Sequence, residues 1–481
     1  MLAKHGTTYL IVKLFPAVLS LLSLVIFTHI LSPEEYGVYS LSILVAGLGN
    51  AVFLQWISLG IGRYLPSAEN AQERMNLLAT ARTLSLCVSL ILIVGTLVIW
   101  LMGYLGSYGV VLWAVGSLCA IQGWNDLNLR IQNANLNPLD YGKILTLKSV
   151  VGFVLGVLSA YFGFGAEGIL VSIMLGFASA SFLSKNIWSN LPWWFIDKAV
   201  LSRLLTYGAP LTITYLLIFV IDASDRFFIE RIIGIEAVGI YSAAYEISQY
   251  SIGTLAAVVN LAALPLVISA MAKHGVEGAQ VQLRKSFLFI LAVALPVSGG
   301  LCMVAPEVAN TLMGARFSAE AERIIPWIAL AIFISAMKSY YFDYAFQLAQ
   351  STHVQMLIVF VCAIINIAMN FWLIPKYGMM GAAISTVIAF AVALGLSWIL
   401  GRKVFPMPTL PYKDTAKLLI AFTCMIISVG SLSLEISLLS LAVKVIVGGM
   451  VYAIALIIMD VCGCKLILSK LLVSLKMKYK K

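Results

Sequence analysis

The sequence predicts an all-α polytopic membrane protein with about fourteen transmembrane helices. Of its 481 residues, 61% are hydrophobic and only 11% are charged, and the mean hydropathy is +0.99. Soluble domains carry about 25% charged residues, so this chain has too few to cover a surface that faces water. Apolar stretches of about 20 residues, the length that crosses the hydrocarbon core, recur from end to end.

Apolar runs and polar punctuation give the position of each predicted helix. The first run, from Tyr9 to Leu31, is too long for a signal-peptide core and lacks a small-residue cleavage site, so we expect it to be retained. The predicted helices span residues 9–31, 38–62, 82–104, 109–128, 143–162, 166–186, 207–229, 238–264, 285–305, 324–346, 355–374, 380–400, 415–433 and 438–462.

The distribution of basic residues predicts the orientation. With a cytoplasmic N-terminus, the external loops hold four of the 31 Lys and Arg residues, namely Arg231, Arg316, Arg323 and Lys376. Three more lie within helices, and the remaining 24 are cytoplasmic. Cytoplasmic loops of membrane proteins are rich in Lys and Arg, so both termini are predicted to be cytoplasmic. The orientation of the chain in the membrane then accounts for the net charge of +10, and nucleic-acid binding is unsupported.

An internal repeat predicts two lobes. Residues 36–40 and 238–242 share Gly, Tyr and Ser at an offset of 202, and residues 165–168 and 378–381 share two glycines ahead of a later helix. Ser172 and Ser385 follow these glycines at matching positions. Six helices separate the copies, so the two halves have one orientation, a common transporter plan.

This repeat predicts three parts of the chain. Residues 1–206 form an N-terminal six-helix lobe, and residues 207–403 form a C-terminal six-helix lobe. Residues 404–481 hold helices 13 and 14 and a basic cytoplasmic tail.

Short motifs resemble those of a known family. Leu31-Ser32-Pro33-Glu34-Glu35-Tyr36-Gly37-Val38-Tyr39-Ser40 resembles the first loop of Wzx-type polysaccharide flippases, which translocate O-antigen and capsule units and belong to the MATE-like MOP superfamily. Residues 207–210, Asp225-Arg226 and residues 238–242 resemble the start of that family's second half. The likeness in helix number and lobe pattern covers the whole chain.

The resemblance implies a transporter rather than an enzyme. It implies a central cavity that opens alternately to each side of the bacterial inner membrane, and a substrate of oligosaccharide linked to undecaprenyl pyrophosphate. Lipid II ranks second as a substrate. A monomer without cofactors is expected, with a polysaccharide polymerase and a chain-length regulator as candidate partners.

Charges inside apolar helices mark candidate sites, because each costs about 2.5–3.5 kcal/mol on insertion scales. Lys338 lies 14 residues, about 21 Å, into the predicted helix 324–346, and Tyr341 and Asp343 follow it. We interpret Lys338 as a cavity cation that attracts the pyrophosphate, with Tyr341 as a neighbouring binding residue and Asp343 as an ion-coupling candidate. A snorkelling lysine is the structural alternative.

The predicted helix 207–229 carries Asp222, Asp225 and Arg226. Positions i and i+4 share a helix face, so Asp222 and Arg226 are expected to pair. Arg226 is a further substrate-binding candidate. The two carboxylates either couple an ion gradient to transport or neutralise the arginine in a structural pair, and the sequence leaves both open.

Weaker candidates follow from single polar residues and prolines. Gln55, His29 and Glu246 lie in helices that face the cleft in the family plan, where they could bind sugar hydroxyls or hold helices together. Pro16 and Pro210 occupy corresponding helices of the repeat and are hinge candidates, because proline kinks a helix.

Missing motifs limit the chemistry. The chain contains no Walker-type loop, no serine elbow and no Cys/His cluster with metal spacing, although Cys462-Gly-Cys464 could be palmitoylated or bind a metal. Two alternatives to a flippase remain. A MATE-like multidrug or cation antiporter should rely on a carboxylate deep in its first lobe, which the first six helices almost lack. An integral-membrane polysaccharide polymerase should carry a large external loop, and none is present.

Overall fold

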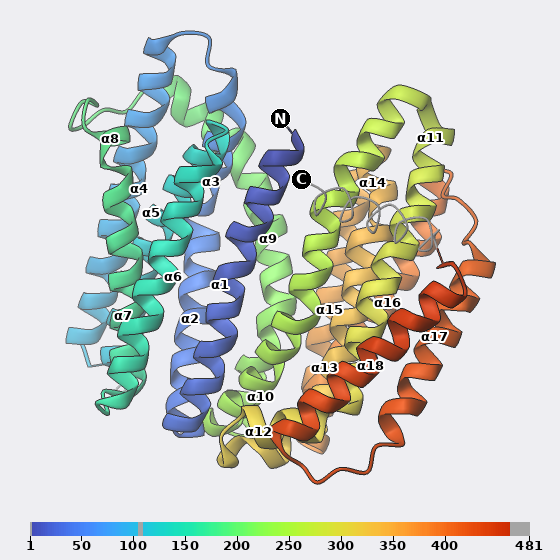
Figure 1. Ribbon diagram of the computed structural model, residues 1–481. Coiled ribbons are helices and arrows are strands. Elements are labelled where there is room, and N and C mark those ends of the chain that lie inside the picture. The colour runs from blue at the N-terminus through green and yellow to red at the C-terminus, as the bar shows by residue number, and fades with distance from the viewer. Residues whose placement is uncertain (1, 104–108, 462–481) are drawn as a thin grey trace, which may run out of the picture. The chain divides into compact units, whose positions relative to one another are not determined.

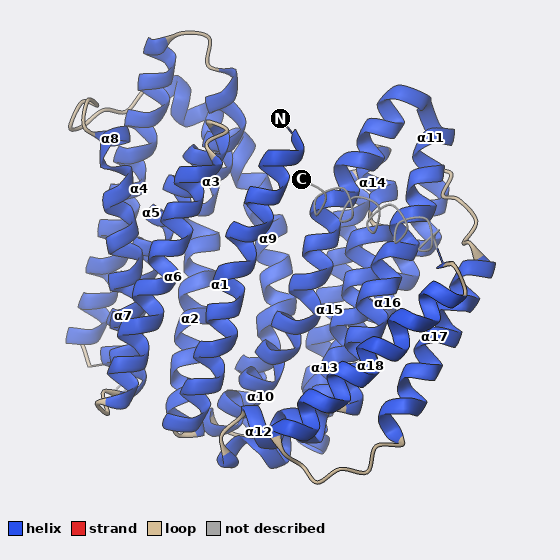
Figure 2. Cartoon of the chain, viewed as in Figure 1, coloured by secondary structure: helices blue, strands red, loops and turns tan. Residues whose placement is uncertain are grey.

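The computed structural model describes residues 2–103 and 109–461, and within these ranges every regular element is helical (Figures 1 and 2). The chain packs into two compact units, Met1–Ala243 and Ala244–Lys481. The predicted lobe boundary at residues 206 and 207 follows the internal repeat rather than packing, and it stays a prediction.

The first unit contains the predicted helices of residues 9–229. A capping box at Ser32 and Glu35 starts α2, because each side chain accepts a hydrogen bond from the other's backbone N–H. The predicted helix 38–62 is broken at Leu54. The elements are α1 (Leu2–Ile30), α2 (Pro33–Phe53), α3 (Gln55–Tyr64), η1 (Leu65–Ser67), α4 (Ala71–Leu101), α5 (Gly109–Ala134), α6 (Pro138–Tyr161), α7 (Gly165–Ser181), η3 (Phe182–Ser184), α8 (Lys185–Trp188), α9 (Lys198–Ile232) and the start of α10 (Ile235–Ser248).

The second unit follows from the end of α10. Its longest element, α11, turns at Gly275, where φ is +62° and glycine is favoured. The predicted loop between helices 238–264 and 285–305 is therefore helical on both sides of a sharp turn (Figure 1). The elements are η4 (Gln249–Gly253), α11 (Thr254–Met303), α12 (Ala305–Leu312), α13 (Ala315–Met337), η5 (Lys338–Phe342), α14 (Tyr344–Leu348), α15 (Thr352–Tyr377), α16 (Met379–Val404), α17 (Tyr412–Gly430) and α18 (Leu438–Ile458).

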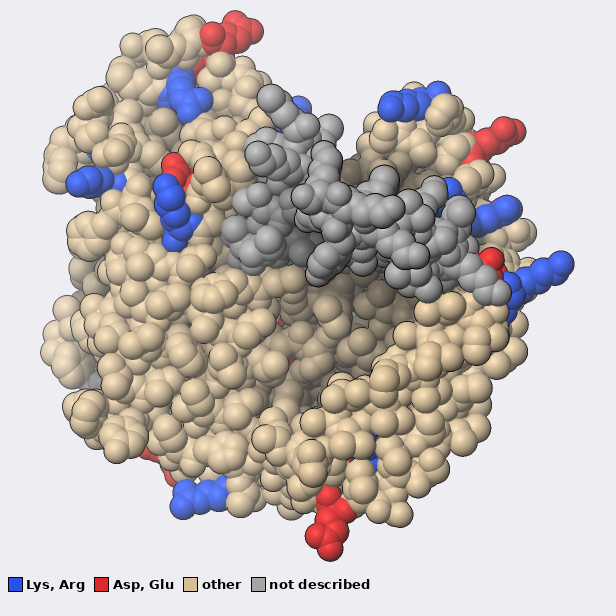
Figure 3. All heavy atoms as spheres, in the orientation of Figure 1, with Lys and Arg blue, Asp and Glu red and all other residues tan. Residues whose placement is uncertain are grey.

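Helix length and composition support a polytopic membrane protein. Among the described residues, nine helical stretches are long and apolar enough to cross a bilayer, or ten if the bent α9 is one span. One of the nine, Ile235–Met303, contains two of the predicted helices. On the face shown in Figure 3, the charged side chains of each unit gather toward the helix ends and leave an uncharged band between them. The number fourteen stays a prediction.

The later copy of the sequence repeat has the same local structure in both halves. Gly165 is the first residue of α7 and Gly378 directly precedes α16, and their φ angles are +56° and +59°. Ser172 and Ser385 are both buried, and each donates a hydrogen bond to the carbonyl four residues earlier, at 2.7 and 3.0 Å. The shared glycines thus have the same positive φ angle at the start of a helix at two places in the chain.

In the earlier repeat, residues 36–40 and 238–242, close packing explains the shared glycine. Gly37 of α2 and Gly239 of α10 face each other within the first unit. A Cβ atom at Gly37 would collide with the carbonyl oxygen of Ile235, and one at Gly239 would collide with the carbonyl oxygen of Pro33. Small residues allow helix backbones to approach this closely in membrane proteins. The contact therefore requires glycine in both copies.

We expect Gly239→Ala to lower the free energy of unfolding by about 2–3 kcal/mol, the upper range for overpacking, because a backbone carbonyl cannot rotate away from the added methyl group. Gly95→Ala in α4 is the matched control, since its Cβ would have no heavy atom within 4 Å. That variant should be neutral or more stable, because alanine favours helix by about 1 kcal/mol over glycine. Thermal melting of the purified protein in detergent measures both, and equal melting temperatures would contradict the close contact.

Candidate functional site

A buried ion pair in the second unit joins two of the residues singled out in the sequence. The ammonium nitrogen of Lys338 lies 2.7 Å from Oδ2 of Asp343, and both side chains are buried. Five residues separate them, a spacing at which side chains of an α-helix do not face each other. Lys338 therefore does not snorkel to the membrane surface, and its charge is neutralised inside the unit.

A π-helical turn makes this pairing possible. Residues Lys338–Phe342 form η5, and the backbone N–H of Asp343 donates to the carbonyl of Lys338 at 2.9 Å, in the i→i+5 pattern of a π-helix. The wider turn brings Asp343 beneath Lys338. Single π-turns within α-helices occur frequently at functional sites. Hydropathy alone carries no signal for such a turn.

Asp343 also connects three helical segments of the second unit. Besides Lys338, its carboxylate accepts hydrogen bonds from Ser397 of α16 at 2.7 Å and from Gln355 of α15 at 3.2 Å. Three donors thus surround a carboxylate that is only 1% exposed, and hydrogen bonds to charged groups are stronger than those between neutral groups. In this arrangement Asp343 is fully engaged, so a role in ion coupling requires these bonds to open.

Tyr341 lies in the core beside this ion pair. It is 1% exposed, and its ring packs against Phe287 of α11 and Phe342, each with a ring-centroid distance of 4.9 Å. The hydroxyl of nearby Tyr344 donates to Asn260. Tyr341 therefore supports the π-turn by packing, and a direct role in substrate binding stays a prediction.

A second buried ion pair lies in the first unit. Nη1 of Arg226 is 3.4 Å from Oδ1 of Asp225, and both side chains are buried. The hydroxyl of Tyr241 donates to the other carboxylate oxygen of Asp225 at 2.6 Å, and Nε of Arg226 donates to Ser242 at 3.1 Å. Residues 241 and 242 belong to the repeated motif, so its second copy supplies the polar partners of this pair.

The predicted side-chain pair between Asp222 and Arg226 needs correction. The guanidinium forms its ion pair with Asp225, and it reaches Asp222 through the backbone carbonyl, which accepts from Nη1 at 2.5 Å. The Asp222 residue itself is exposed. The i, i+4 spacing therefore does bring Arg226 to Asp222, but the contact is with the backbone carbonyl of Asp222 and not with its carboxylate.

The other sequence candidates lie outside these two ion pairs. His29 is exposed, and its Nδ1 lies 2.7 Å from the carbonyl oxygen of Val25. Gln55 is half-buried at the start of α3, directly after the helix break at Leu54. Glu246 is half-buried in α10, shortly before the π-helical turn η4. Roles for these three residues in binding sugars stay predictions.

The hinge candidates are both inside helices. Pro16 lies in α1 and Pro210 in α9. α9 bends by 43° between Leu217 and Phe219, which is beyond Pro210 rather than at it. A hinge role for either proline therefore stays a prediction.

The sequence missed a polar contact inside the first unit. Asn50 of α2 is buried and donates to the carboxylate of Asp126 of α5 at 2.8 Å. Asp126 lies eight residues, about 12 Å, before the end of α5, although the predicted helix 109–128 ends only two residues after it. The neighbouring Asn125 is fully buried and makes no side-chain hydrogen bond within the described residues. In the sequence, this contact could have been suspected only from Asn50, a single amide side chain within an apolar helix.

A third, partly buried ion pair involves the extra C-terminal helices. Lys444 of α18 binds Glu307 of α12. Lys444 is one of the three basic residues that the sequence places within the predicted helices, together with Arg226 and Lys338. Among the described residues, no group of three or more His, Cys, Asp or Glu side chains could hold a metal ion. Cys462 and Cys464 lie outside the described residues.

Comparison with known proteins identifies the family. Residues 26–322, more than half of the chain, match the family described as "Polysaccharide biosynthesis protein". The chain belongs to this family. A protein named "Putative O-antigen transporter" from Shigella flexneri is 25% identical over 201 residues, which are 42% of this chain and 47% of that protein. The match thus spans about half of that relative's length.

Solved structures establish the fold. The chain resembles "Lipid II flippase MurJ, inward closed conformation" with a TM-score of 0.77 and 14% identity, over 94% of this chain and 98% of that one. It also resembles an inward-facing multidrug resistance MATE family transporter of the MOP superfamily, with a TM-score of 0.64 and 14% identity over 83% and 97% of the two chains. The family and fold inferred from the short motifs are therefore confirmed.

The two partners of the buried pair in the second unit should differ in their effect on stability. We expect Asp343→Leu to lower the free energy of unfolding by about 3–5 kcal/mol, because it leaves the Lys338 ammonium buried without its anion. Lys338→Met should cost less, because Asp343 keeps the hydrogen bonds from Gln355 and Ser397. The double variant should recover part of the loss. Thermal melting in detergent measures all three, and equal losses for the single variants would contradict this account of Asp343.

Proposed function

We propose that the chain is a flippase that moves undecaprenyl-pyrophosphate-linked oligosaccharide units from the cytoplasmic to the outer leaflet of the bacterial inner membrane, for surface polysaccharide biosynthesis. Both termini are cytoplasmic, and the protein works as a monomer by alternating access. It delivers its substrate to a polysaccharide polymerase that acts with a chain-length regulator. No cofactor takes part, and the chain is not an enzyme.

One observation carries this proposal: a chain of the polysaccharide biosynthesis family has the fold of a solved lipid II flippase over 94% of its length. A pyrophosphate linked to sugars cannot enter hydrocarbon without a compensating cation. The polyprenyl tail has no such requirement and stays in the lipid. The protein therefore needs cations at membrane depth that are available during only part of the cycle.

Lys338 and Arg226 are the proposed cations. In the described structure each is paired with a carboxylate, Asp343 or Asp225, so neither charge is left uncompensated. In the proposed cycle the pyrophosphate replaces the carboxylate as the anion beside the lysine or arginine. A proton or a cation then compensates the released carboxylate, which couples an ion gradient to transport.

A second candidate function is a MATE-like multidrug or cation antiporter. The sequence argument against it was the near absence of a deep carboxylate in the first six helices. The contact between Asn50 and Asp126 provides such a carboxylate within the first unit, which favours this candidate. An antiporter would alter drug susceptibility and leave the glycans of the cell unchanged.

Deletion of the gene should cause complete lipid-linked saccharide units to accumulate in the cytoplasmic leaflet, with loss of surface polymer. Mass spectrometry of lipid-linked glycans, with a protease- or label-accessibility assay for the leaflet, measures this outcome. Single unpolymerised units at the cell surface would indicate a polymerase instead. Unchanged glycans would contradict the proposal and favour the antiporter.

Asp225→Asn should lower transport on the order of tenfold while the protein is still expressed, since hydrogen bonds to charged groups contribute about 1.5–3 kcal/mol and Arg226 loses its anion. Surface polymer per amount of membrane-inserted protein is the measurement. Asp414→Asn is the matched control, because Asp414 pairs with Lys417 at a partly exposed site at the start of α17. Normal transport by Asp225→Asn would eliminate the coupling role of this carboxylate.

A further inference from the structure

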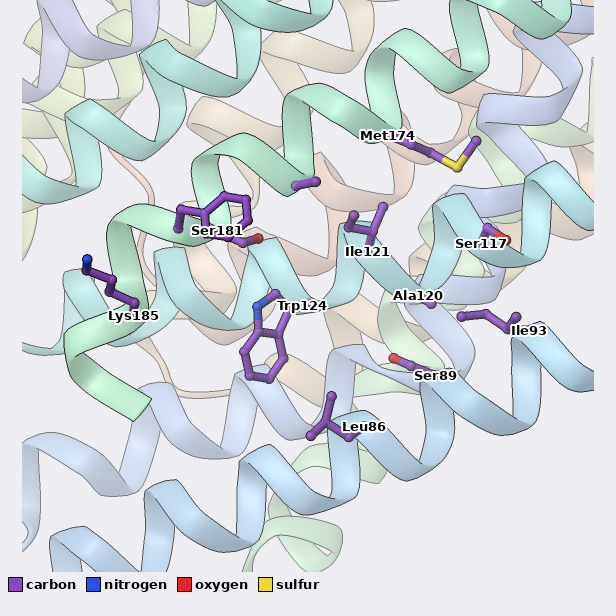
Figure 4. Close-up of a pocket in the computed structure, with 12 residues that line it drawn as sticks. Leu86, Ser89, Ile93, Ser117, Ala120, Ile121, Trp124, Met174, Ser181 and Lys185 are labelled. Atoms are coloured by element: carbon purple, nitrogen blue, oxygen red, sulfur yellow. The ribbon is translucent and has the colours of Figure 1, made fainter. Parts of the chain in front are cut away.

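A cavity of about 530 Å³ opens within the first unit between α4, α5 and α7 (Figure 4). Its volume is in the range of sites that bind small molecules. Apolar side chains dominate its walls, including Leu86 and Ile93 of α4, Ile121 of α5 and Met174 of α7. We refer to it as the α4–α5–α7 groove. It contains none of the residues of the three ion pairs described above.

The groove has one charged end. Lys185 is its only ionisable lining residue, and Figure 4 shows it at one end of the row, beyond Ser181, with Ile93 and Ser117 at the other. From Leu86 to Ile93 the wall extends about 10 Å along α4, at 1.5 Å per residue. Half of a hydrocarbon core is about 15 Å thick, so the groove is shorter than one leaflet.

Part of the groove's wall is exposed on the surface of the unit. Only 6% of the most apolar window of α4 is buried within the structure. Leu86 is 48% exposed and Phe182, at the charged end, is 74% exposed. In a membrane protein such side chains contact acyl chains, so hydrocarbon has direct access to the groove.

The charged end lies among residues typical of the membrane interface. Trp193 and Trp194 are 88% and 67% exposed in the loop that follows α8, and tryptophan is enriched at the headgroup level of bilayers. Arg82 holds this loop, since its guanidinium donates to the backbone carbonyls of Trp188 and Pro192. Arg82 is thereby engaged, whereas Lys185 is exposed and makes no ion pair with the described residues.

We propose that the α4–α5–α7 groove is a binding site for an anionic phospholipid, with one acyl chain along the apolar wall and the headgroup phosphate against Lys185. Basic residues beside clefts between transmembrane helices commonly bind anionic lipid headgroups. The wall follows about 10 Å of the roughly 15 Å that one acyl chain spans in a leaflet. An undecaprenyl chain of eleven isoprene units is far longer. The site is thus separate from the transported substrate, and the inference does not rest on the proposed function.

Native mass spectrometry of the purified full-length protein in detergent tests this site, with phosphatidylglycerol and zwitterionic phosphatidylcholine as probes. The unmodified protein should bind phosphatidylglycerol more tightly. Lys185→Gln should weaken phosphatidylglycerol binding about fivefold, equivalent to the roughly 1 kcal/mol that one basic residue contributes at an anionic surface, and leave phosphatidylcholine binding unchanged. Lys198→Gln, an exposed lysine at the start of α9 outside the groove, is the matched control and should change neither.

A second variant tests the apolar wall separately from the charge. Ala178 lines the groove from α7, so Ala178→Trp should fill it and reduce the binding of both lipids. The exposed position of Lys185 keeps the charge test valid even if this variant fails to fold. Equal effects of Lys185→Gln and Lys198→Gln, or equal affinity of the unmodified protein for the two lipids, would overturn the proposal. Displacement of phosphatidylglycerol by equimolar undecaprenyl phosphate in a Lys185-dependent manner would also overturn it, because the groove would then belong to the polyprenyl lipid.

Discussion

The free-energy cost of an ionised side chain in a medium without water governs where charge can lie in this protein. Three cations of the described helices have a carboxylate partner within their own unit: Lys338 with Asp343, Arg226 with Asp225, and Lys444 with Glu307. Removing one partner of such a pair is strongly destabilising, whereas replacing both by apolar side chains is often neutral or favourable. Buried ion pairs are therefore poor devices for stability alone. The proposed function gives these pairs a different role, because it requires a charge that becomes available during part of the cycle.

The ion pair in the second unit shows how local backbone geometry brings two charged side chains together. A single π-turn widens the helix after α13, so Lys338 and Asp343 become neighbours although five residues separate them. The same carboxylate holds Ser397 of α16 and Gln355 of α15. Neutralisation of Asp343 would thus loosen three helical segments at once. A change of charge at one atom is in this way linked to the packing of the unit.

The internal repeat contributes two different constraints. At Gly165 and Gly378 it preserves a backbone conformation, the left-handed turn that starts α7 and α16. At Gly37 and Gly239 it preserves the absence of a side chain, because the starts of α2 and α10 touch through their backbones. The rest of this motif has diverged in role. Tyr39 packs its ring against Phe27 and Tyr36, whereas Tyr241 donates a hydrogen bond to Asp225.

The sequence by itself determined the solvent, the class of fold and the family, because hydropathy and helix length are sums over neighbouring residues and need no knowledge of packing. It also identified Lys338, Arg226 and Asp225 as unusual, since any charge in an apolar run has a cost wherever it points. The tertiary structure alone decided their partners. Asp343 pairs with Lys338 through a π-turn that has no hydropathy signal, and Arg226 pairs with Asp225 rather than Asp222. The contact between Asn50 and Asp126 and the groove near Lys185 depend on how separate helices rotate and pack, which a pattern along one helix does not specify.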